Sequence, residues 1–512
     1  MARKGSRKVR TGCHTCKVRK VKCDEAKPSC FRCTSTGRKC DGYPTARLPG
    51  LTWYRPNHLF QSVDQPEEGR ALEFFCHTAG LLLSGPLDAY FWTHLVLQFS
   101  NFEPAVRHSL VAISSLYEDF HCKGKSAQQL QTNTFALIHY NAAIENLRKL
   151  DSEPLILLVC VLFVCIEVIQ NNREAAMQHS RHGIVILERI GTSYPWTVEY
   201  LSPIFRRLSL FPLFFGNSAN TFPALSDLHD PIPVMFISFA EAQYHMDAIT
   251  CRAARLVRQG DVFRIGKLHR EPVDPDLLKM QKDLQRTINS WHDSFKILAA
   301  RIDLSDKDNA YCNLMLRYKI SRLWATTTFE KNETFHDDHI DDLAEIFDRA
   351  EEQSPPESNC ETASLRPCFT FEIGFVPFVI CAVMKIRDLR TRLRGLRVLR
   401  SYGPKRENMW EAERFYPICK RLVEIEHDIV LDENDQPVGD VNWDARPTEE
   451  QRCKDFGSLP NKVRQKDANG NEVWGSYAGY IMRTVEGKIW LRQEFIRRPA
   501  PLVDEQGSYS EK

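Results

Sequence analysis

The strongest constraint on this sequence is a short repeat in which the pattern C-x2-C-x6-C occurs twice within 28 residues. The cysteines concerned are Cys13, Cys16, Cys23, Cys30, Cys33 and Cys40. A C-x2-C pair lets a tight turn point two sulfurs at one metal ion, and the third cysteine of each unit returns after one or two helical turns. A segment this short cannot build a sufficient apolar core, so metal is expected to hold it together. Residues 13–40 are therefore predicted to fold as two short helix-loop halves around metal.

Ligand arithmetic indicates how many ions the repeat holds. Structural zinc takes four tetrahedral ligands, so two Zn²⁺ ions need eight bonds, which six thiolates supply only if two of them bridge. The symmetry of the repeat favours bridging cysteines at equivalent positions. The alternatives are one four-cysteine zinc site with two spare thiols, and a thiol-rich metal store. A disulfide-stapled secreted domain is not expected, because the N-terminus has no apolar signal stretch.

The residues between the cysteines indicate the partner of the module. Residues 1–40 contain 13 Lys and Arg against two acidic residues, whereas the rest of the chain carries more acidic than basic residues. The first spacer is expected to be a short basic helix, and a helix of this kind can place cations on guanine while its neighbours hold phosphates. Double-stranded DNA is the predicted partner, and an RNA or chromatin adaptor is the alternative. The candidate contacts are Lys17, Arg19, Lys20 and Lys22 in the spacer, with Arg7 and Lys8 in a basic arm, residues 1–12.

The segment CHTCKVRKVKCDEAKPSCFRCTSTGRKC resembles the fungal Zn2Cys6 binuclear-cluster transcription regulators in every ligand spacing and in the proline before the fourth cysteine. The resemblance implies that Cys13 and Cys30 bridge two Zn²⁺ ions. Cys16 and Cys23 would complete one ion, and Cys33 and Cys40 the other. It further implies nuclear localisation and that Lys20 reads a CGG triplet, with Arg19 a weaker candidate; Pro28 occupies a loop position that often takes a cis bond.

Residues 41–70 are predicted to be a linker rather than a dimerising helix. Prolines occur at positions 44, 49, 56 and 66, and no heptad repeat is present. A coiled-coil zipper cannot form across such a segment. The isolated zinc module is expected to be a monomer, and any homodimer contact to lie in the helical domain that follows.

Residues 71–500 are predicted to form a large all-α regulatory domain, followed by a flexible tail, residues 501–512. Apolar side chains recur at helical spacing in 106–120, behind a proline suited to a first helical turn, and again in 137–147. The apolar run 155–166 is too short to cross a bilayer and is expected to be a buried helix, so no membrane partner is predicted. The next helix is expected to end at Gly191, and Asn469-Gly470 marks a candidate hairpin.

The segments EPAVRHSLVAISSLYEDF and ALIHYNAAIENL are similar to the helical regulatory domain that accompanies such zinc clusters. The resemblance implies contacts with the transcription machinery or co-regulators, no catalysis, and a role at RNA polymerase II promoters, including those of secondary-metabolite gene clusters. The rival reading is a small-molecule receptor or metabolic enzyme with an appended zinc module. Its best support is the cluster of histidines and aspartates in 336–342, which an acidic amphipathic helix explains better.

Overall fold

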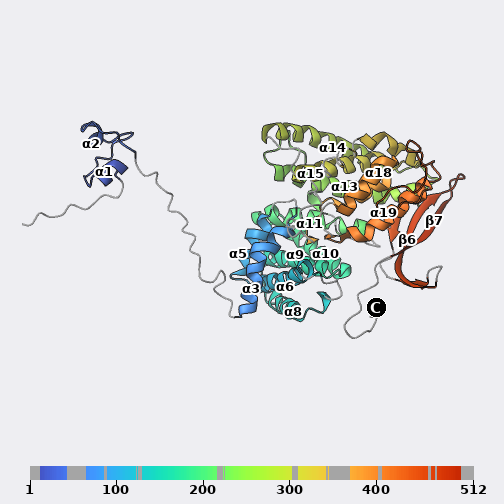
Figure 1. Cartoon of the computed structure of the whole chain (residues 1–512), viewed down its shortest axis with the longest axis horizontal. Coiled ribbons are helices and arrows are strands. Elements are labelled where there is room, and N and C mark those ends of the chain that lie inside the picture. The colour runs from blue at the N-terminus through green and yellow to red at the C-terminus, as the bar shows by residue number, and fades with distance from the viewer. Residues whose placement is uncertain are drawn as a thin grey trace, which may run out of the picture. The chain divides into compact units, whose positions relative to one another are not determined.

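The structure of the chain is a computed structural model that divides into two compact units, residues 1–61 and residues 62–512, which are described separately (Figure 1). The residues that the structure describes are 12–42, 65–85, 89–122, 124, 130–215, 223, 225–302, 309–341, 344, 347, 369–401, 406–458, 463–466 and 470–497. The basic arm with Arg7 and Lys8, most of the predicted linker, and the predicted tail 501–512 lie outside them.

In its described residues, 12–42, the first unit has two short helices, each followed by a loop. They are α1 (His14–Val18) and α2 (Phe31–Thr34). The Lys27–Pro28 peptide bond between the two halves is cis. The predicted pair of helix-loop halves is confirmed.

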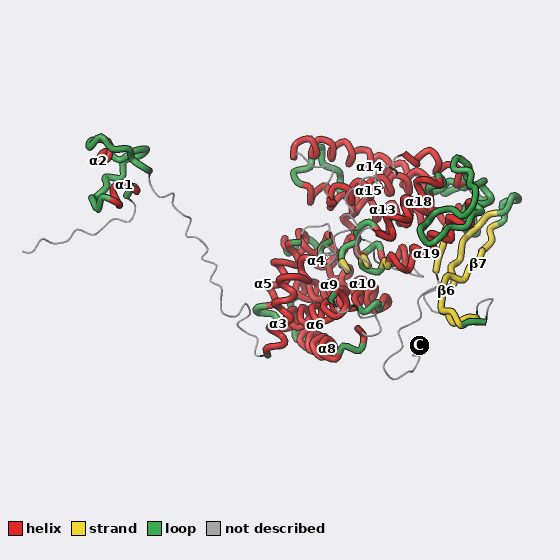
Figure 2. The backbone as a smooth tube through the Cα atoms, in the orientation of Figure 1, coloured by secondary structure: helices red, strands yellow, loops and turns green. Residues whose placement is uncertain are grey.

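The second unit is mostly helical, with a sheet at its end (Figure 2). Its first helices are α3 (Pro66–Phe74), η1 (Phe75–Ala79), α4 (Gly80–Leu83), η2 (Phe91–Leu95), α5 (Val96–Ser100), α6 (Pro104–His121), α8 (Thr134–Leu147), α9 (Glu153–Ile169), α10 (Arg173–Ile190), η3 (Thr197–Leu201), α11 (Ser202–Leu208) and α12 (Phe211–Phe215). The later helices are η5 (Ser226–His229), α13 (Phe239–Arg264), α14 (Pro275–Ile302), α15 (Asn309–Thr327), η6 (Glu333–His339), α17 (Val376–Lys385), α18 (Leu389–Ser401) and α19 (Ala412–His427). Residues 66–70, at the end of the predicted linker, form the start of α3.

Helix α6 follows the sequence prediction closely. Pro104 occupies its first turn, and Val106, Leu110, Ile113 and Tyr117 are buried along one face. The Tyr117 hydroxyl donates a hydrogen bond of 2.9 Å to the carbonyl of Phe369, which ties the helix to a segment far along the chain.

Helix α8 differs from its prediction. The apolar periodicity favoured a buried face that includes Leu137, but Leu137 is 37% exposed. The buried positions are instead Ala136, His139 and Ala143. Small residues allow α8 to pack closely, so size and not hydrophobicity decides which face of this helix is covered.

Helix α9 carries the long apolar run and is buried along nearly its whole length, as expected. It packs between α6 and α10. Helix α10 ends at Gly191, as predicted, and the φ of 51° there is one that glycine adopts without steric cost. In the part of the chain that the structure describes, no helix has the length and apolar character needed to span a membrane.

Two sheets complete the second unit. The small one joins β1 (Phe369–Thr370), β2 (Arg406–Glu407) and β3 (Trp410–Glu411). The larger one contains β4 (Asp455–Ser458), β5 (Val463–Lys466), β6 (Glu472–Arg483) and β7 (Ile489–Arg497). Strands β4, β5 and β7 each pair antiparallel with β6. The β5–β6 pair is the hairpin that Asn469-Gly470 marked, with φ of 80° at Gly470. The large region is thus mostly helical, as predicted, with a sheet over 455–497 whose extent the sequence reading did not anticipate.

Buried ion pairs link the helices of the second unit. Arg207 donates to Glu372 at 2.6 and 2.9 Å and to Asp247 at 2.9 Å, and Arg317 donates to Asp247 at 2.5 Å. All four side chains are nearly or fully buried. Removing one partner would leave an uncompensated buried charge, which is strongly destabilising.

A second buried set surrounds Glu333, which is fully buried on η6. Its carboxylate pairs with Lys385 at 3.0 Å, Arg387 at 3.1 Å and Arg264 at 3.4 Å. The carbonyl of Lys454 accepts hydrogen bonds from Lys385 at 2.7 Å and from Arg264 at 2.9 Å. Desolvation acts to raise the pKa of Glu333, but the surrounding cations outweigh it and hold that pKa well below its usual range.

A buried carboxylate also caps α17. Glu407 accepts hydrogen bonds from the backbone N–H groups of Gly374 at 3.1 Å, Phe375 at 3.1 Å and Val376 at 2.8 Å. A Cβ at position 374 would overlap this carboxylate, which explains the glycine there. The unpaired N–H groups at the start of the helix are satisfied by one side chain from β2.

Candidate functional site

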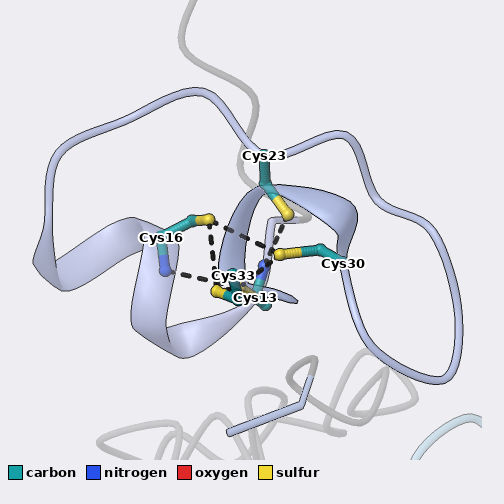
Figure 3. Packing of buried hydrophobic residues seen from close by; sticks show 5 residues of the cluster. All are labelled: Cys13, Cys16, Cys23, Cys30 and Cys33. Atoms are coloured by element: carbon teal, nitrogen blue, oxygen red, sulfur yellow. Dashed lines mark hydrogen bonds between the residues drawn. The ribbon is translucent and has the colours of Figure 1, made fainter. Parts of the chain in front are cut away.

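The six cysteines of the repeat converge on one point between α1 and α2, although they span 28 residues. Figure 3 shows five of them, all but Cys40. The structure places them in two groups of four, in each of which the sulfurs lie within 4.8 Å of one another. One group is Cys13, Cys16, Cys23 and Cys30, and the other is Cys13, Cys30, Cys33 and Cys40. Cys13 and Cys30 therefore belong to both groups.

The sulfur separations suit tetrahedral zinc. The Cys13 and Cys30 sulfurs lie 3.6 Å apart, and that of Cys16 lies 3.7 Å from Cys30. Four ligands at the usual Zn–S distance of about 2.3 Å stand about 3.8 Å apart along the edges of a tetrahedron. The donor set is thiol only, which is the set that structural zinc prefers.

Proton loss from the thiols is coupled to metal binding at this cluster. Burial raises the pKa of the Cys13 thiol to about 12 and also raises that of Cys30. These thiols are thus protonated at neutral pH when no metal holds them, and each must lose its proton to become a ligand.

Local structure explains how the sulfurs are held. Cys13 caps the N-terminus of α1, where its sulfur accepts from the backbone N–H of Cys16 at 3.3 Å. Cys30 has the same position before α2. Asp24 accepts from the backbone N–H of Phe31 at 2.9 Å and so caps α2 from a distant loop. Desolvation opposes the effect, but this N–H and its neighbours lower the pKa of Asp24.

The basic spacer is not helical throughout, which corrects the sequence prediction. Helix α1 ends at Val18, so of the spacer cations only Lys17 lies in the helix. Lys20 has a φ of 57°, in the left-handed region. Its N–H donates to the carbonyl of Lys17, and the N–H of Val21 donates to the carbonyl of Cys16. This pair of bonds is a Schellman ending, in which the residue at the left-handed position is usually glycine.

The predicted DNA contacts differ in their exposure. Lys17, Lys20 and Lys22 are exposed on the surface of the module. Arg19 is half-buried, and its guanidinium donates to the hydroxyl of Thr36 at 3.3 Å, which connects the two halves. Arg7 and Lys8 lie outside the described residues.

Sequence reasoning missed the contacts that close the module. The Thr15 hydroxyl donates to the carboxylate of Asp41 at 2.7 Å, and the N–H of Asp41 donates back to that hydroxyl at 3.0 Å. The N–H of His14 donates to the carbonyl of Gly42 at 3.0 Å. The folded module therefore continues past Cys40, and the only sequence signal was the Asp-Gly pair at 41–42.

Among the described residues, one further group of side chains has the types that bind metals. It consists of Glu68, His108 and His139. The two imidazoles hydrogen-bond each other at 3.0 Å, and His139 pairs with Glu68 at 3.9 Å. Burial lowers the pKa of both histidines. The three side chains thus have polar partners in one another, and they link α3, α6 and α8.

In its described part, residues 336–341, the histidine and aspartate cluster does not assemble as a site. His336 is buried beside Glu333, while Asp337 points to Arg452, with which it makes an ion pair of 2.8 Å. His179 packs edge-on against Phe163 and lies 3.4 Å from the Tyr140 hydroxyl, as expected of a core histidine.

Comparison with known proteins identifies the module. Residues 11–49 match the family described as the fungal Zn(2)-Cys(6) binuclear cluster domain. The chain is 31% identical over 214 residues to the aspercryptin biosynthesis cluster-specific transcription regulator atnN of Emericella nidulans, which covers 35% of this chain and 34% of the relative. It is 55% identical over 98 residues to the transcriptional regulatory protein moc3 of Schizosaccharomyces pombe, 19% of either chain.

A third relative is the transcription regulator lscL of Purpureocillium lilacinum, 29% identical over 198 residues, which is 33% of this chain and 47% of the relative. The matches thus span half or less of the length of these relatives. No solved structure matches the chain. The family and the relatives are transcription regulators and not enzymes, in agreement with the sequence prediction.

Proposed function

Since residues 11–49 belong to the fungal Zn(2)-Cys(6) binuclear cluster family, a family of zinc-containing DNA-binding modules, we propose that the whole chain is a sequence-specific, DNA-binding transcription regulator. The observation that carries this proposal is the sharing of Cys13 and Cys30 by two four-thiol groups. That arrangement presents the basic spacer on a rigid support, and a support of this kind is what groove recognition requires.

The proposed metal centre would hold two Zn²⁺ ions. Cys13 and Cys30 would be ligands of both, Cys16 and Cys23 would complete the set of one, and Cys33 and Cys40 that of the other. When bound, zinc supplies the charge that keeps the thiols deprotonated and the cross-links that fix the fold.

The proposed DNA contacts divide into one reader and several phosphate contacts. Lys20 stands at the exposed end of α1 and is the base-reading residue, with CGG as its expected triplet. Lys17 and Lys22 lie on either side of it, and with Arg7 and Lys8 of the arm they hold phosphates. Arg19 is better suited to bracing the two halves, because Thr36 already accepts from its guanidinium.

The second unit is proposed to report to the transcription machinery or to co-regulators, and to bring two copies of the chain together as a homodimer. The proposed location is the nucleus, at RNA polymerase II promoters. Control of a secondary-metabolite gene cluster is the favoured biological setting, because the relative from Emericella nidulans is named as a regulator of such a cluster.

Competition binding tests the proposal. The zinc-loaded full chain is bound to a labelled CGG-containing duplex, and unlabelled CGG duplex, scrambled duplex or RNA is added. We expect the CGG duplex to compete at concentrations at least about a thousandfold lower than the others, the usual separation of specific from non-specific binding. Equal competition by RNA would favour the adaptor, and no binding to any of them would favour a receptor or enzyme.

A further inference from the structure

Strand β7 (Ile489–Arg497) lies at the outer edge of the larger sheet (Figure 1). It pairs with β6 along its whole length, from Gly475–Arg497 to Arg483–Ile489. Among the strands that the structure describes, none pairs with its other edge. An edge strand presents a row of unpaired N–H and C=O groups, to which another strand can add.

This edge lacks two of the features that usually block strand addition, proline and a bulge. The strand contains no proline, and it has no bulge against β6. Trp490 and Leu491 are 42% and 54% exposed, although both are large and apolar. Long, exposed, apolar edges are rare in proteins that function as monomers.

The sequence of β7, IWLRQEFIR, is complementary to itself when two copies run antiparallel about Gln493. Arg492 of one copy then lies opposite Glu494 of the other, and by symmetry the same pair forms a second time. Directly opposed side chains in antiparallel strands contact each other, and opposite charges in that position are stabilising.

The apolar residues match in the same register. Leu491 lies opposite Phe495, and Trp490 lies opposite Ile496. A shift of one residue in register would bring side chains of opposite faces together. A shift of two residues keeps the faces aligned but places Arg492 or Glu494 opposite its own copy, so the charges select this register.

The two faces of the sheet give these pairs different surroundings. On the face turned to the helices, Tyr480 is buried and its hydroxyl donates to the carbonyl of Ile418 in α19 at 3.0 Å. Arg492 and Glu494 share this face, because they pair with Tyr480 and Ala478 of β6. Within one chain Arg492 already donates to Glu494 at 2.7 Å, and Arg421 pairs with Glu494 at 3.3 Å. The pairs across the interface would thus add to an existing charge cluster on the sheltered side of the sheet, where salt screens it less.

On the opposite face, Leu491 and Phe495 lean across β6. A Cβ at Gly479 would overlap Leu491, and a Cβ at Gly475 would overlap the Phe495 ring. These two glycines leave room for the apolar side chains to lie flat. A partner strand added at the open edge would bring further apolar side chains beside Leu491 and Phe495.

We propose that β7 is a homodimer interface, in which two copies of this chain pair antiparallel about Gln493 and join their larger sheets into one. The inference deepens the proposed function, in which the second unit brings two copies of the chain, and so two zinc modules, together. Only the biological role of the interface rests on that function. The interface itself needs neither DNA nor zinc.

Sedimentation of the full chain without DNA, with paired charge variants, tests the interface. Arg492→Glu places like charges opposite each other in a homodimer, and so does Glu494→Arg. We expect the dissociation constant of the dimer to be at least about tenfold higher for each variant alone than for the unchanged chain. An equimolar mixture restores both opposite-charge pairs across the two-fold axis and should sediment as a heterodimer. Rearranged contacts within one chain cannot produce that rescue.

Two further variants complete the test. Leu491→Glu should weaken the dimer, while Val234→Glu, at a site 89% exposed outside the sheet, should leave it unchanged. Far-UV circular dichroism checks that each variant is folded. A monomeric unchanged chain at all accessible concentrations, or a mixture that does not dimerise, overturns the proposal. Neither result affects preferential binding to CGG, so failure of the interface and failure of the proposed function are distinguishable.

Discussion

Lys20 has two separable effects: its left-handed backbone lowers the stability of the module, and its charge is proposed to recognise DNA. A residue with a Cβ in that conformation costs about 1 kcal/mol or more relative to glycine. Sparsely populated backbone conformations persist where the surrounding structure imposes them, often at functional sites. Here the thiol groups fix the start of α1 and the return to Cys23, so the turn between them must reverse sharply.

Substitution of Lys20 should therefore affect stability and recognition in opposite ways. Lys20→Gly should leave the module at least as stable as the unchanged chain, because glycine relieves the strained backbone. It should nevertheless remove about 1–3 kcal/mol of discrimination in favour of CGG, because the donor to guanine is lost. Thermal unfolding and titration with CGG and scrambled duplexes measure the two effects.

Lys22→Ala is the matched control, since Lys22 is equally exposed but proposed to contact phosphate. It should weaken binding to all duplexes alike and reduce the log–log salt slope by about 0.9. If Lys20→Gly retained the full CGG preference, another residue would be the reader.

The buried Glu407 carboxylate predicts a pH dependence of stability. Burial raises its pKa to about 7, although three backbone N–H donors act to lower it. Between the ordinary pKa of 4.5 and about 7, the folded chain binds a proton that the unfolded chain does not. The contribution to stability therefore falls as pH rises through this window, by at most about 1.4 kcal/mol per pH unit.

Glu407→Gln should remove that slope. The free energy of unfolding of the unchanged chain minus that of the variant should decrease from pH 4.5 to 7 and stay constant above. Urea unfolding followed by circular dichroism across pH 4.5–8 measures it. Parallel pH profiles for the two chains would contradict the assignment.

At the level of elements, the sequence predicts a helix best where the residues that indicate the helix also indicate which of its faces is buried. For α6 a proline marks the start and large apolar residues mark the covered face. For α8 the existence of the helix is predictable, but its covered face is set by small residues that fit a neighbour, as at Ala136 and Ala143. Close approach depends on the partner helix, which a single sequence does not specify.

The same distinction applies to the metal centre. Ligand spacing alone identified all six cysteines that the structure brings together. It did not reveal where α1 ends, because the left-handed turn at Lys20 is imposed by the return to the metal centre. Nor did it reveal the closure of the module by Thr15 and Asp41, since that contact joins residues 26 positions apart.

Two glycines in helices provide a test of packing at the level of elements. A Cβ at Gly183 of α10 would overlap the Phe205 ring of α11, whereas nothing lies within 4 Å of a Cβ at Gly69 of α3. Gly183→Ala should lower the free energy of unfolding by about 1–3 kcal/mol through overpacking. Gly69→Ala should raise it by up to about 1 kcal/mol through helix propensity. Urea denaturation compares them, and equal effects would refute the close α10–α11 contact.

For the whole molecule, the division into two units implies that they lose structure independently. The first unit has two helices of five and four residues, and its buried residues are mainly the cysteines. The second unit has an extensive apolar core and buried ion pairs of its own. Metal should thus be necessary for the first unit and irrelevant to the second.

Chelation tests that independence. We expect two zinc ions per chain by native mass spectrometry, and EDTA should make residues 12–42 sensitive to protease while most of the helical circular dichroism signal remains. Cys30→Ser should resemble the chelated chain, whereas Cys160→Ser, in the core of α9, should keep both ions. One zinc per chain, with Cys40→Ser leaving stoichiometry and fold unchanged, would exclude the binuclear centre.

The charges around Glu333 have a consequence for the order in which the chain can fold during synthesis. Arg264 and Lys385 both donate to the carbonyl of Lys454, across 190 and 69 residues of chain. Until the ribosome has made residue 454, these cations can pair with Glu333 but lack the carbonyl acceptor, and water must take its place. Helices α13 and α17 can form earlier, but their shared charged interior can close only after residue 454 has been made. Truncated products that stop before Lys454 are therefore expected to expose this interior to the quality-control machinery of the cell.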